Sequence, residues 1–540
     1  VSNIGTIARS GTKAFIESMS GDKAEDSQLI GQFGVGFYSA FIVADRVTIE
    51  TRKAGTVADE GVRWESEGTD SYSIENITRE TRGTDITLHL REEEKEFLDA
   101  WRLRSIINKF SDHISIPVMM LKESMGEEEE EKEKEKGEEW EQVNTGTALW
   151  MRSKSDISED EYREFYKHIA HDFDDPLEWI HNRVEGTNEY TSLLYVPKRA
   201  PFDLWDPNQK HGVKLYVKRV FIMDEADKLM PRYLRFIKGI VDADDLPLNV
   251  SREILQHNRK IDAIRTANIK RILGLLEKMS KKEEEYQEFW NTFGRVLKEG
   301  PAEDHDNGER IAGLLRFVTT KSEGDTQSVG LDQYLERMPE AQEKIYYITA
   351  DSLTAARYSP HLEIFRKNDI EVLLLTDHVD EWLVSHLHEY KGKKLQSVAK
   401  GEIDDALIKE EQQEEKEEKA GEQKAFLERV QSSLGERSKE VRVSKRLTES
   451  PACLVVEDYD MSQNLARVLK QMGQDAPMPT PILEINLDHP VVKKLEQTDG
   501  QEQFDDLASV LFDQALLAEG GKLEDPAGFV HRLNSLLSGL

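Results

Sequence analysis

The sequence contains a single cysteine, Cys453, in 540 residues. One thiol excludes an internal disulfide framework and any metal cluster built on several thiolates. No apolar run approaches the length that spans a bilayer, and the chain does not open with the charged and then apolar segments of a secretion signal. These features predict a soluble protein of the reducing cytoplasm.

Positive charge is scarce as well. Lysine and arginine number 72 against 105 aspartates and glutamates, which gives a net charge of −33. Because such a surface repels a phosphate backbone, the composition argues against nucleic-acid binding, and nothing indicates a membrane partner. Hydrophobic residues still make up 38% of the chain. That fraction allows sizeable cores, and the length predicts roughly three or four domains.

Two charged stretches with few apolar residues divide the chain. Glu127–Glu131 opens a run of alternating Lys and Glu, and Lys409–Lys424 is rich in Glu and Gln. Such segments cannot build a core of their own. We therefore expect a first domain at residues 1–122, a charged linker at 123–141, a middle domain at 142–400, a charged connector at 401–424 and a last domain at 425–540.

Apolar periodicity predicts an α/β fold class of the α+β kind. Strand patterns at Val47–Thr51 and Thr84–Leu90, with a helical stretch at Phe97–Phe110, indicate a two-layer α/β sandwich for the first domain. The middle domain is predicted to be α/β. Its expected strands lie at residues 214–222, 344–348 and 370–375, and its expected helices at residues 264–279, 286–297 and 360–367. The last domain is predicted to be mainly helical and to end in two amphipathic helices.

The most informative segment is a glycine cluster at residues 30–41, which holds Gly31, Gly34 and Gly36. Glycines allow a close approach of the backbone, and a helix starting at Phe37 would point free N–H groups at an anion. A nucleotide phosphate suits such a cradle. Taken alone, such a glycine cluster is more often a plain turn, and the Lys-Ser/Thr pair of the P-loop is missing.

Two further blocks give the cluster its meaning. Residues 5–12, Gly-Thr-Ile-Ala-Arg-Ser-Gly-Thr, are rich in small and hydroxyl side chains, and residues 82–90, Arg-Gly-Thr-Asp-Ile-Thr-Leu-His-Leu, alternate as a half-buried strand does. Together the three blocks resemble the N-terminal ATPase domain of the heat-shock protein ninety chaperones in their bacterial form, and the similarity can be followed through essentially the whole chain. It implies an ATP-dependent molecular chaperone for partly folded client proteins, a homodimer, with ATP and Mg²⁺ as cofactors.

The resemblance also assigns residues to the nucleotide. Ser10 and Gly11 belong to a flexible, hydroxyl-rich segment able to cover a bound nucleotide as a lid. Thr84 would face the adenine. The remaining contacts, to ribose and phosphates, would come from Asn3, Arg9, Gly34, Val35, Gly36 and Phe37. Arg9 stands where the family more often has Lys, which keeps the charge but changes the donor geometry.

One departure from the family concerns catalysis. The family's catalytic Glu, its magnesium-binding Asn and the Asp that reads the adenine amino group all precede the position of Val1. The chain as given is therefore interpreted as lacking the first part of the ATPase domain. Because hydrolysis needs a carboxylate to activate water, we expect little or no ATPase activity from it.

A second catalytic element is expected in the middle domain, at residues 246–256. Asn249 or Ser251 can cap a helix that places Arg252 and Gln256 four residues apart on one face. From the residues alone, an ordinary surface ion pair is the commoner role. The resemblance makes Arg252 the group that contacts the γ-phosphate and couples domain closure to nucleotide state, with Gln256 beside it.

Client and dimer contacts are expected towards the C-terminus. Met461, Leu465, Leu469 and Met472 form an apolar stripe at helical spacing, and soft methionines suit varied partners, although such a stripe is often core. The family's client helix falls here. Its dimer contact falls on the two terminal helices, so the resemblance makes the last domain the dimerisation domain. The candidate residues there are Phe504, Leu511, Phe529, Leu533 and Leu537.

Other interpretations stay open at this stage. A nucleotide-independent holdase or dimeric scaffold would keep the client and dimer surfaces without turnover. Another ATPase of the same nucleotide fold, such as a mismatch-repair or histidine-kinase relative, is disfavoured by the acidic composition. His168 and His171 could share a helix face, but no ligand partner lies at metal-binding spacing, so no metal site is predicted.

Overall fold

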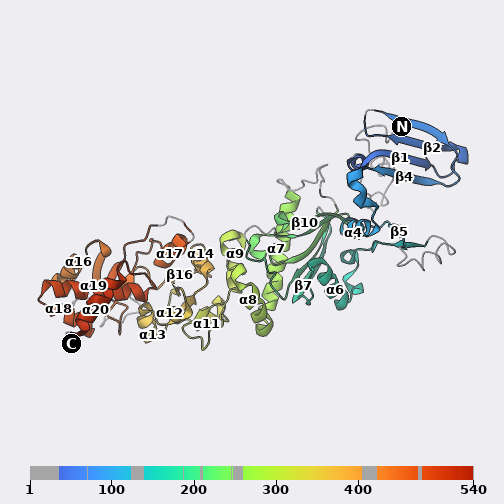
Figure 1. Cartoon of the computed structure of the whole chain (residues 1–540). Helices are drawn as coiled ribbons and strands as arrows, with labels where there is room; N and C mark the ends of the chain where they lie inside the picture. The colour runs from blue at the N-terminus through green and yellow to red at the C-terminus, as the bar shows by residue number, and fades with distance from the viewer. Residues whose placement is uncertain are drawn as a thin grey trace, which may run out of the picture. The chain divides into compact units, whose positions relative to one another are not determined.

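The structure is a computed structural model that describes residues 36–69, 71–122, 139–186, 188–206, 211–244, 246, 259–403, 423–471, 473 and 477–538. The chain divides into two compact units, one made of residues 1–231 and 235–272 and the other of residues 232–234 and 273–540 (Figure 1). Both units mix helices with sheets, as the sequence predicts. Among the described helices, none is long and apolar enough to cross a membrane.

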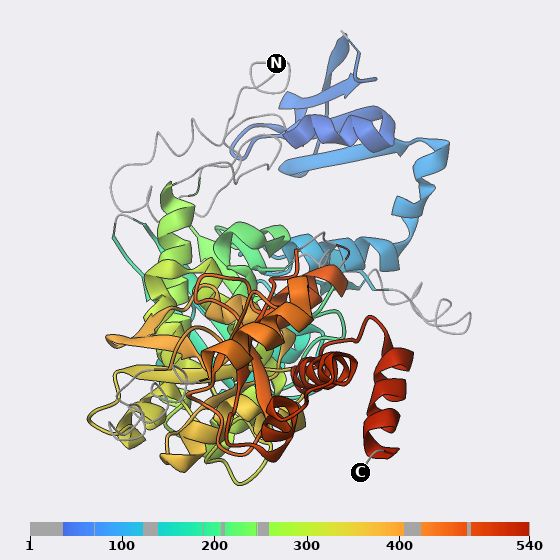
Figure 2. The same ribbon diagram turned by 90° about the vertical axis from the view of Figure 1, so that its left-hand side faces the viewer.

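The first unit begins with a four-stranded antiparallel sheet. Its strands are β1 (Ala44–Arg52), β2 (Gly61–Ser66), β3 (Tyr72–Ile77) and β4 (Gly83–Leu90), in the order β3-β2-β1-β4. A single 3₁₀ turn, η1 (Gly36–Ser39), leads into the short helix α3 (Ala40–Val43). Figure 2 shows this helical segment lying along the sheet. Phe37 and Phe41 pack there against a small core of Val47, Ile49 and Trp64.

The two faces of this sheet differ because side chains alternate along each strand. On one face, Val47 and Ile49 lie opposite Leu88 and Ile86 of β4. On the other face, Thr48 donates a hydrogen bond to Glu65 over 2.8 Å and lies 3.1 Å from His89. The hydrogen bond from Thr48, helped by nearby arginines, holds the pKa of Glu65 below its usual range. The sheet therefore has one apolar and one polar face.

A helical connection leads from this sheet to the next one. The 3₁₀ segment η3 (Glu92–Leu98) ends at Asp99, whose side chain accepts a hydrogen bond from the Arg102 N–H and caps α4 (Ala100–Ser111). The predicted helix at Phe97–Phe110 is therefore confirmed only from Ala100 onward, because Asp99 interrupts it. Phe110 on α4 then packs edge-on against Phe221, with ring centroids 5.5 Å apart. The short strands β5 (Met119–Leu121) and β6 (Trp140–Gln142) pair with each other.

The second sheet of this unit has five strands in the order β10-β9-β11-β8-β7. Their bounds are β7 (Glu178–Val184), β8 (Tyr190–Val196), β9 (Val213–Val217), β10 (Val220–Ala226) and β11 (Lys238–Ala243). Helix α6 (Glu159–Ala170) covers one face, and Trp150 and Tyr166 are buried between them. Ser158 and Glu161 cap the start of α6 reciprocally. Hydrogen bonds from Arg152 and Ser158 lower the pKa of Glu161 to about 2.

One predicted strand is wrong. Residues 214–222 alternate as a single long strand, but the structure folds them into the hairpin β9–β10. Lys218 and Arg219 form its two-residue turn, and both adopt positive φ angles, 50° and 66°. Such turns usually hold Asn or Gly. Because neither residue type stands here, the sequence gives no sign of the turn.

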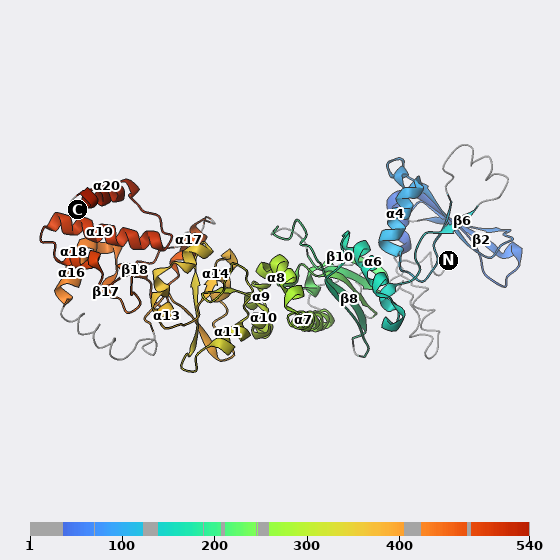
Figure 3. The same cartoon turned by 90° about the horizontal axis from the view of Figure 1, so that it is seen from below.

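Four helices follow the second sheet in the chain. Figure 3 shows α7 (Arg259–Met279), α8 (Glu283–Leu297), α9 (Gly300–Glu303) and α10 (Gly308–Leu314) in the green part of the chain. Helix α7 belongs to the first unit as far as residue 272, and the other three belong to the second. The helices predicted at 264–279 and 286–297 are confirmed by α7 and α8. Tyr286 in the first turn of α8 and Leu297 at its last position are buried. The hydroxyl of Tyr286 donates to the Leu314 carbonyl over 2.6 Å, which ties α8 to the end of α10.

A third sheet follows, with the order β12-β14-β13-β16-β15. Its strands are β12 (Val318–Thr319), β13 (Lys344–Thr349), β14 (Leu373–Leu375), β15 (Glu389–Tyr390) and β16 (Lys393–Ser397). The surrounding helices are α11 (Leu331–Arg337), α12 (Leu353–Arg357), η9 (Pro360–Leu362), α13 (Glu363–Lys367) and α14 (His378–Val384). The strand predicted at 370–375 pairs in parallel with β13, but only over its last three residues. The strand at 344–348 and the helical segment at 360–367 are confirmed.

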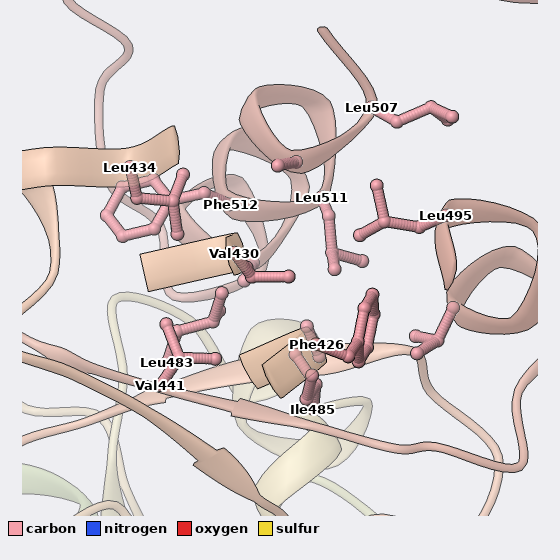
Figure 4. Close-up of a cluster of buried hydrophobic side chains, with 14 of the residues drawn as sticks. Phe426, Val430, Leu434, Val441, Leu483, Ile485, Leu495, Leu507, Leu511 and Phe512 are labelled. Carbon is pink, nitrogen blue, oxygen red and sulfur yellow. The ribbon is translucent and has the colours of Figure 1, made fainter. Parts of the chain in front are cut away.

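The last part of the chain packs three strands under helices. Strands β17 (Glu440–Val443), β18 (Ala452–Val455) and β19 (Ile482–Ile485) are ordered β17-β19-β18. The helices are α16 (Lys424–Leu434), α17 (Gln463–Gln471), α18 (Pro490–Glu496), α19 (Gln501–Ala518) and α20 (Pro526–Ser538). Figure 4 shows Phe426 and Val430 of α16 meeting Leu511 of α19 over the strands. The two predicted terminal helices are confirmed by α19 and α20.

Candidate functional site

The candidate nucleotide residues fall into two groups. Gly36, Phe37 and Thr84 are described by the structure. The others lie outside the described residues: Asn3, Arg9, Ser10, Gly11, Gly34, Val35, Arg252 and Gln256. The described part of the candidate nucleotide site is therefore limited to residues of η1 and β4.

Gly36 opens the helical segment that the sequence predicts after the glycine cluster. A Cβ atom built on Gly36 would have no heavy atom within 4 Å, so the backbone there faces open space. The ring of Phe37 packs against that of Trp64, with centroids 5.7 Å apart. A ligand at this point would thus meet main-chain atoms rather than the Phe37 side chain.

Thr84 lies at the start of β4, directly opposite Thr51 of β1, and their hydroxyl oxygens are 2.7 Å apart. It shares the apolar face with Ile86 and Leu88, which are 54% and 39% exposed. An exposed apolar surface edged by two hydroxyl groups fits a flat heterocyclic base such as adenine. The described residues are therefore compatible with the nucleotide that the sequence predicts.

The candidate client residues lie on and beside α17. Ser462 and Asn464 donate hydrogen bonds to Glu381 of α14 over 2.9 and 2.8 Å. Arg467 donates to the carbonyls of Glu519 and Gly520, and it pairs with Asp351 at 3.1 Å. The polar side of α17 is therefore fastened to two neighbouring segments.

The apolar side of α17 is only half-buried. Ala466 is fully buried, but Met461, Leu465, Val468 and Leu469 remain partly exposed. Met472 lies outside the described residues. The helix is thus held by its polar side while part of its apolar side stays exposed to solvent. We call this set, Met461, Leu465, Val468 and Leu469, the α17 surface.

Two aromatic residues near the α17 surface were missed by the sequence interpretation. Trp382 on α14, the helix that contacts α17, is 55% exposed, and its ring lies 4.5 Å from that of His386. Tyr459, two residues before Met461, is fully exposed. Sequence gives no sign of this for Trp382, because an aromatic residue in an amphipathic helix is usually core. By contrast, Trp150 is buried and donates to Asp242 over 2.8 Å, where burial raises the pKa of the carboxyl to about 6.

The candidate dimer residues divide between two helices. Phe504 and Leu511 on α19 are 0% and 1% exposed and belong to the chain's own core, so their side chains are already used there. Phe529 and Leu533 on α20 are half-buried, and Leu537 is 58% exposed. The exposed side chains of α20 are therefore available for a contact between two copies, whereas the candidate side chains of α19 pack inside their own chain.

Comparisons with known proteins agree with this architecture. The model of the Hsp90 protein family matches residues 122–539. The chaperone protein HtpG of Nitrosococcus oceani is 60% identical over 539 residues, which cover 99% of this chain and 84% of that protein. HtpG of Methylococcus capsulatus is 59% identical over 542 residues, covering 100% of this chain and 85% of that protein.

The chain therefore belongs to the Hsp90 family of molecular chaperones. Its relatives place it with the bacterial HtpG type within that family. Members of the family bind ATP, hydrolyse it weakly, and act as dimers on client proteins. The family expected from the glycine cluster and its two neighbouring blocks is thus confirmed.

Proposed function

We propose that this protein is an ATP-dependent chaperone that binds partly folded clients on the α17 surface. The observation that supports the proposal is the anchoring of α17 by Ser462, Asn464 and Arg467, which leaves its leucines accessible. An unfolded segment exposes apolar side chains that a native protein hides, so it can bury them here. Trp382, which is exposed on the helix α14 that contacts α17, would add a rigid aromatic contact.

The nucleotide is proposed to bind at the apolar face of the first sheet. Thr84 and Thr51 would meet the base, while the main chain at Gly36, with Asn3, Arg9, Ser10, Gly11, Gly34, Val35 and Phe37, would surround the ribose and phosphates. Bound ATP with Mg²⁺ would supply the free energy that drives domain closure. The chain's own groups orient the base and exclude water from it.

Arg252 and Gln256 are proposed to reach the γ-phosphate, so that the nucleotide state controls domain closure. The domain bounds predicted from the charged stretches are retained in this proposal, with residues 1–122 as the nucleotide domain and residues 425–540 as the dimerisation domain. Two copies would join through α20. We propose the cytoplasm as the location.

The test measures how well the full chain suppresses the aggregation of a heat-denatured enzyme, followed by light scattering. We expect suppression at near-equimolar ratio, and several-fold weaker suppression by Leu465→Ser with Leu469→Ser. Leu98→Ser is the matched control, because Leu98 is 72% exposed but lies on η3. Equal suppression by all three proteins would refute the assignment of the α17 surface.

The role of ATP is tested in the same assay. Suppression that changes when ATP and Mg²⁺ are added supports the nucleotide-driven cycle. Suppression that ATP leaves unchanged, together with no heat on titrating ATP into the full chain, would instead make the protein a nucleotide-independent holdase.

A further inference from the structure

A cavity in the first unit is lined by none of the residues assigned to the two proposed sites. It has a volume of about 600 Å³ and is lined by the end of α4, the end of α6 and the strands β9, β10 and β11. That volume is within the range of small-molecule sites. The cavity borders on the covering side of the five-stranded sheet, where α6 stops at His171.

Two glycines shape one wall of this cavity. Gly239 has a φ angle of 143°, and a Cβ atom there would stand 2.2 Å from the Leu193 carbonyl oxygen. Gly212 has a φ angle of 128°, and a Cβ atom on it would stand 2.6 Å from the backbone of Ala226. Only glycine tolerates either arrangement, so no side chain from these positions fills the space.

The lining of the cavity is rich in basic groups. Six basic side chains face it from three directions, namely Lys109, His113, His168, His171, Lys214 and Lys238. Only two carboxylates accompany them, Asp224 and Glu225. With neutral histidines the lining carries three positive and two negative charges. This excess is unusual in a chain whose net charge is −33.

Two of the three lysines in the lining form ion pairs with a carboxylate. Asp224 is shared by two lysines, Lys109 at 3.7 Å and Lys214 at 3.4 Å. Lys238 on β11 has no carboxylate within ion-pairing distance in the part of the chain that the structure describes. Its ammonium group is therefore available to a ligand.

We propose that this cavity binds a small phosphate-bearing anion, of the size of pyrophosphate or a sugar phosphate. Lys238 would contact the phosphate directly, and Lys109 and Lys214 would add to the positive potential around it. Lysine ammonium groups act as compact point charges on phosphate. A metal ion is not the alternative here, because no group of three His, Cys, Asp or Glu side chains within the described ranges could hold one.

The histidines make the proposed binding depend on pH. Burial lowers the pKa of His113, despite the nearby Asp112 carboxylate and Thr147 carbonyl. Burial, then Lys214 and His168, lower the pKa of His171. Both are therefore mainly neutral near pH 7. An anion favours the protonated imidazole, so its affinity is expected to rise as the pH falls from 7.5 towards 6.

The test titrates pyrophosphate into the full chain and measures heat. We expect saturable binding that becomes about tenfold weaker in Lys238→Gln, because one charge-assisted hydrogen bond is lost. Lys228→Gln is the matched control, since Lys228 is an exposed lysine of the same unit that does not line the cavity. Binding that is equal in all three proteins, or absent from the wild type, would overturn the proposal.

A second measurement uses only the wild-type protein, so it does not depend on the folding of a variant. Lysines are acylated with an amine-reactive reagent, with and without pyrophosphate, and the products are quantified by mass spectrometry. We expect several-fold protection of Lys238 and none of Lys228. Equal reactivity of Lys238 in both conditions would count against the site.

Discussion

Lys298 offers the sharpest test of how the second unit is held together. Its side chain is 1% exposed, and its ammonium group lies 2.8 Å from Asp377 and 2.7 Å from Asp380. It also sits over the ring of Phe317, 5.2 Å from the centroid. One buried cation therefore joins the end of α8 to the start of α14.

Lys298→Met is expected to be strongly destabilising, because it leaves two buried carboxylates without their shared cation. Asp377 keeps the exposed Arg295 at 3.0 Å. Among the residues that the structure describes, Asp380, whose side chain is 1% exposed, keeps only the Asp377 N–H. Removing one member of a buried ion pair costs about 3–5 kcal/mol. A loss of about 3 kcal/mol raises the local opening equilibrium by at least about 100-fold.

The assay is hydrogen exchange followed by mass spectrometry on peptides covering α8 and α14, which reports local opening without requiring two-state unfolding of a large chain. Lys321→Met is the control, because the Lys321–Asp369 pair, 3.1 Å apart, is exposed and contributes about 0–1 kcal/mol. Comparable exchange in both variants would refute the reasoning.

The same variant has a predictable pH dependence. Burial already raises the pKa of Asp380 in the presence of Lys298. Without the cation this rise becomes larger. A group with a raised folded-state pKa loses stability as the pH increases through that pKa. The deficit of Lys298→Met is therefore expected to shrink from pH 8 to pH 5, and a growing deficit would contradict this account.

Three further predictions concern local stability, measured by the same hydrogen-exchange assay on peptides that cover the substituted residue. Arg446→Met should cost about 3–5 kcal/mol, because the buried Arg446 donates to Glu484 over 2.8 Å and the pair is almost fully enclosed; a loss below about 1 kcal/mol would contradict it. Burial raises the pKa of Glu363, but hydrogen bonds from the N–H groups of residues 448–450 hold it below its usual range. Glu363→Gln should therefore cost about 1–2 kcal/mol at pH 7, a difference that disappears as the pH falls through the lowered folded-state pKa of Glu363; a pH-independent difference would count against it. Gly239→Ala should cost about 1–3 kcal/mol or more through backbone strain, whereas Gly274→Ala on α7, whose Cβ meets nothing within 4 Å, should be neutral or stabilising.

The amphipathic helices of this chain could be predicted because their apolar spacing is regular. The strands were harder. The turn at Lys218 and Arg219 uses left-handed backbone without Gly or Asn, so its alternating sequence is typical of one long strand. At residues 370–375 the apolar run continues beyond the pairing, since burial and strand hydrogen bonding begin at different residues.

The candidate sites depend on exposure, which composition does not give. Leu465 and Leu469 have the spacing of core residues, yet both stay partly exposed. Ser462 and Asn464 hold α17 to Glu381 by its polar side, and this contact leaves the leucines accessible. The burial of Lys298 could not be predicted from the sequence either, because its partners Asp377 and Asp380 are about 80 residues away along the chain.

Photo-crosslinking from a benzophenone side chain placed at position 469 tests the client assignment most directly. The reference probe stands at position 98, which is more exposed but lies outside the α17 surface. We predict that the probe at 469 crosslinks a partly folded client and not its native form, with several-fold less crosslinking from position 98. Equal crosslinking from both positions, or crosslinking of the native form alone, would contradict the proposal that α17 is where clients bind.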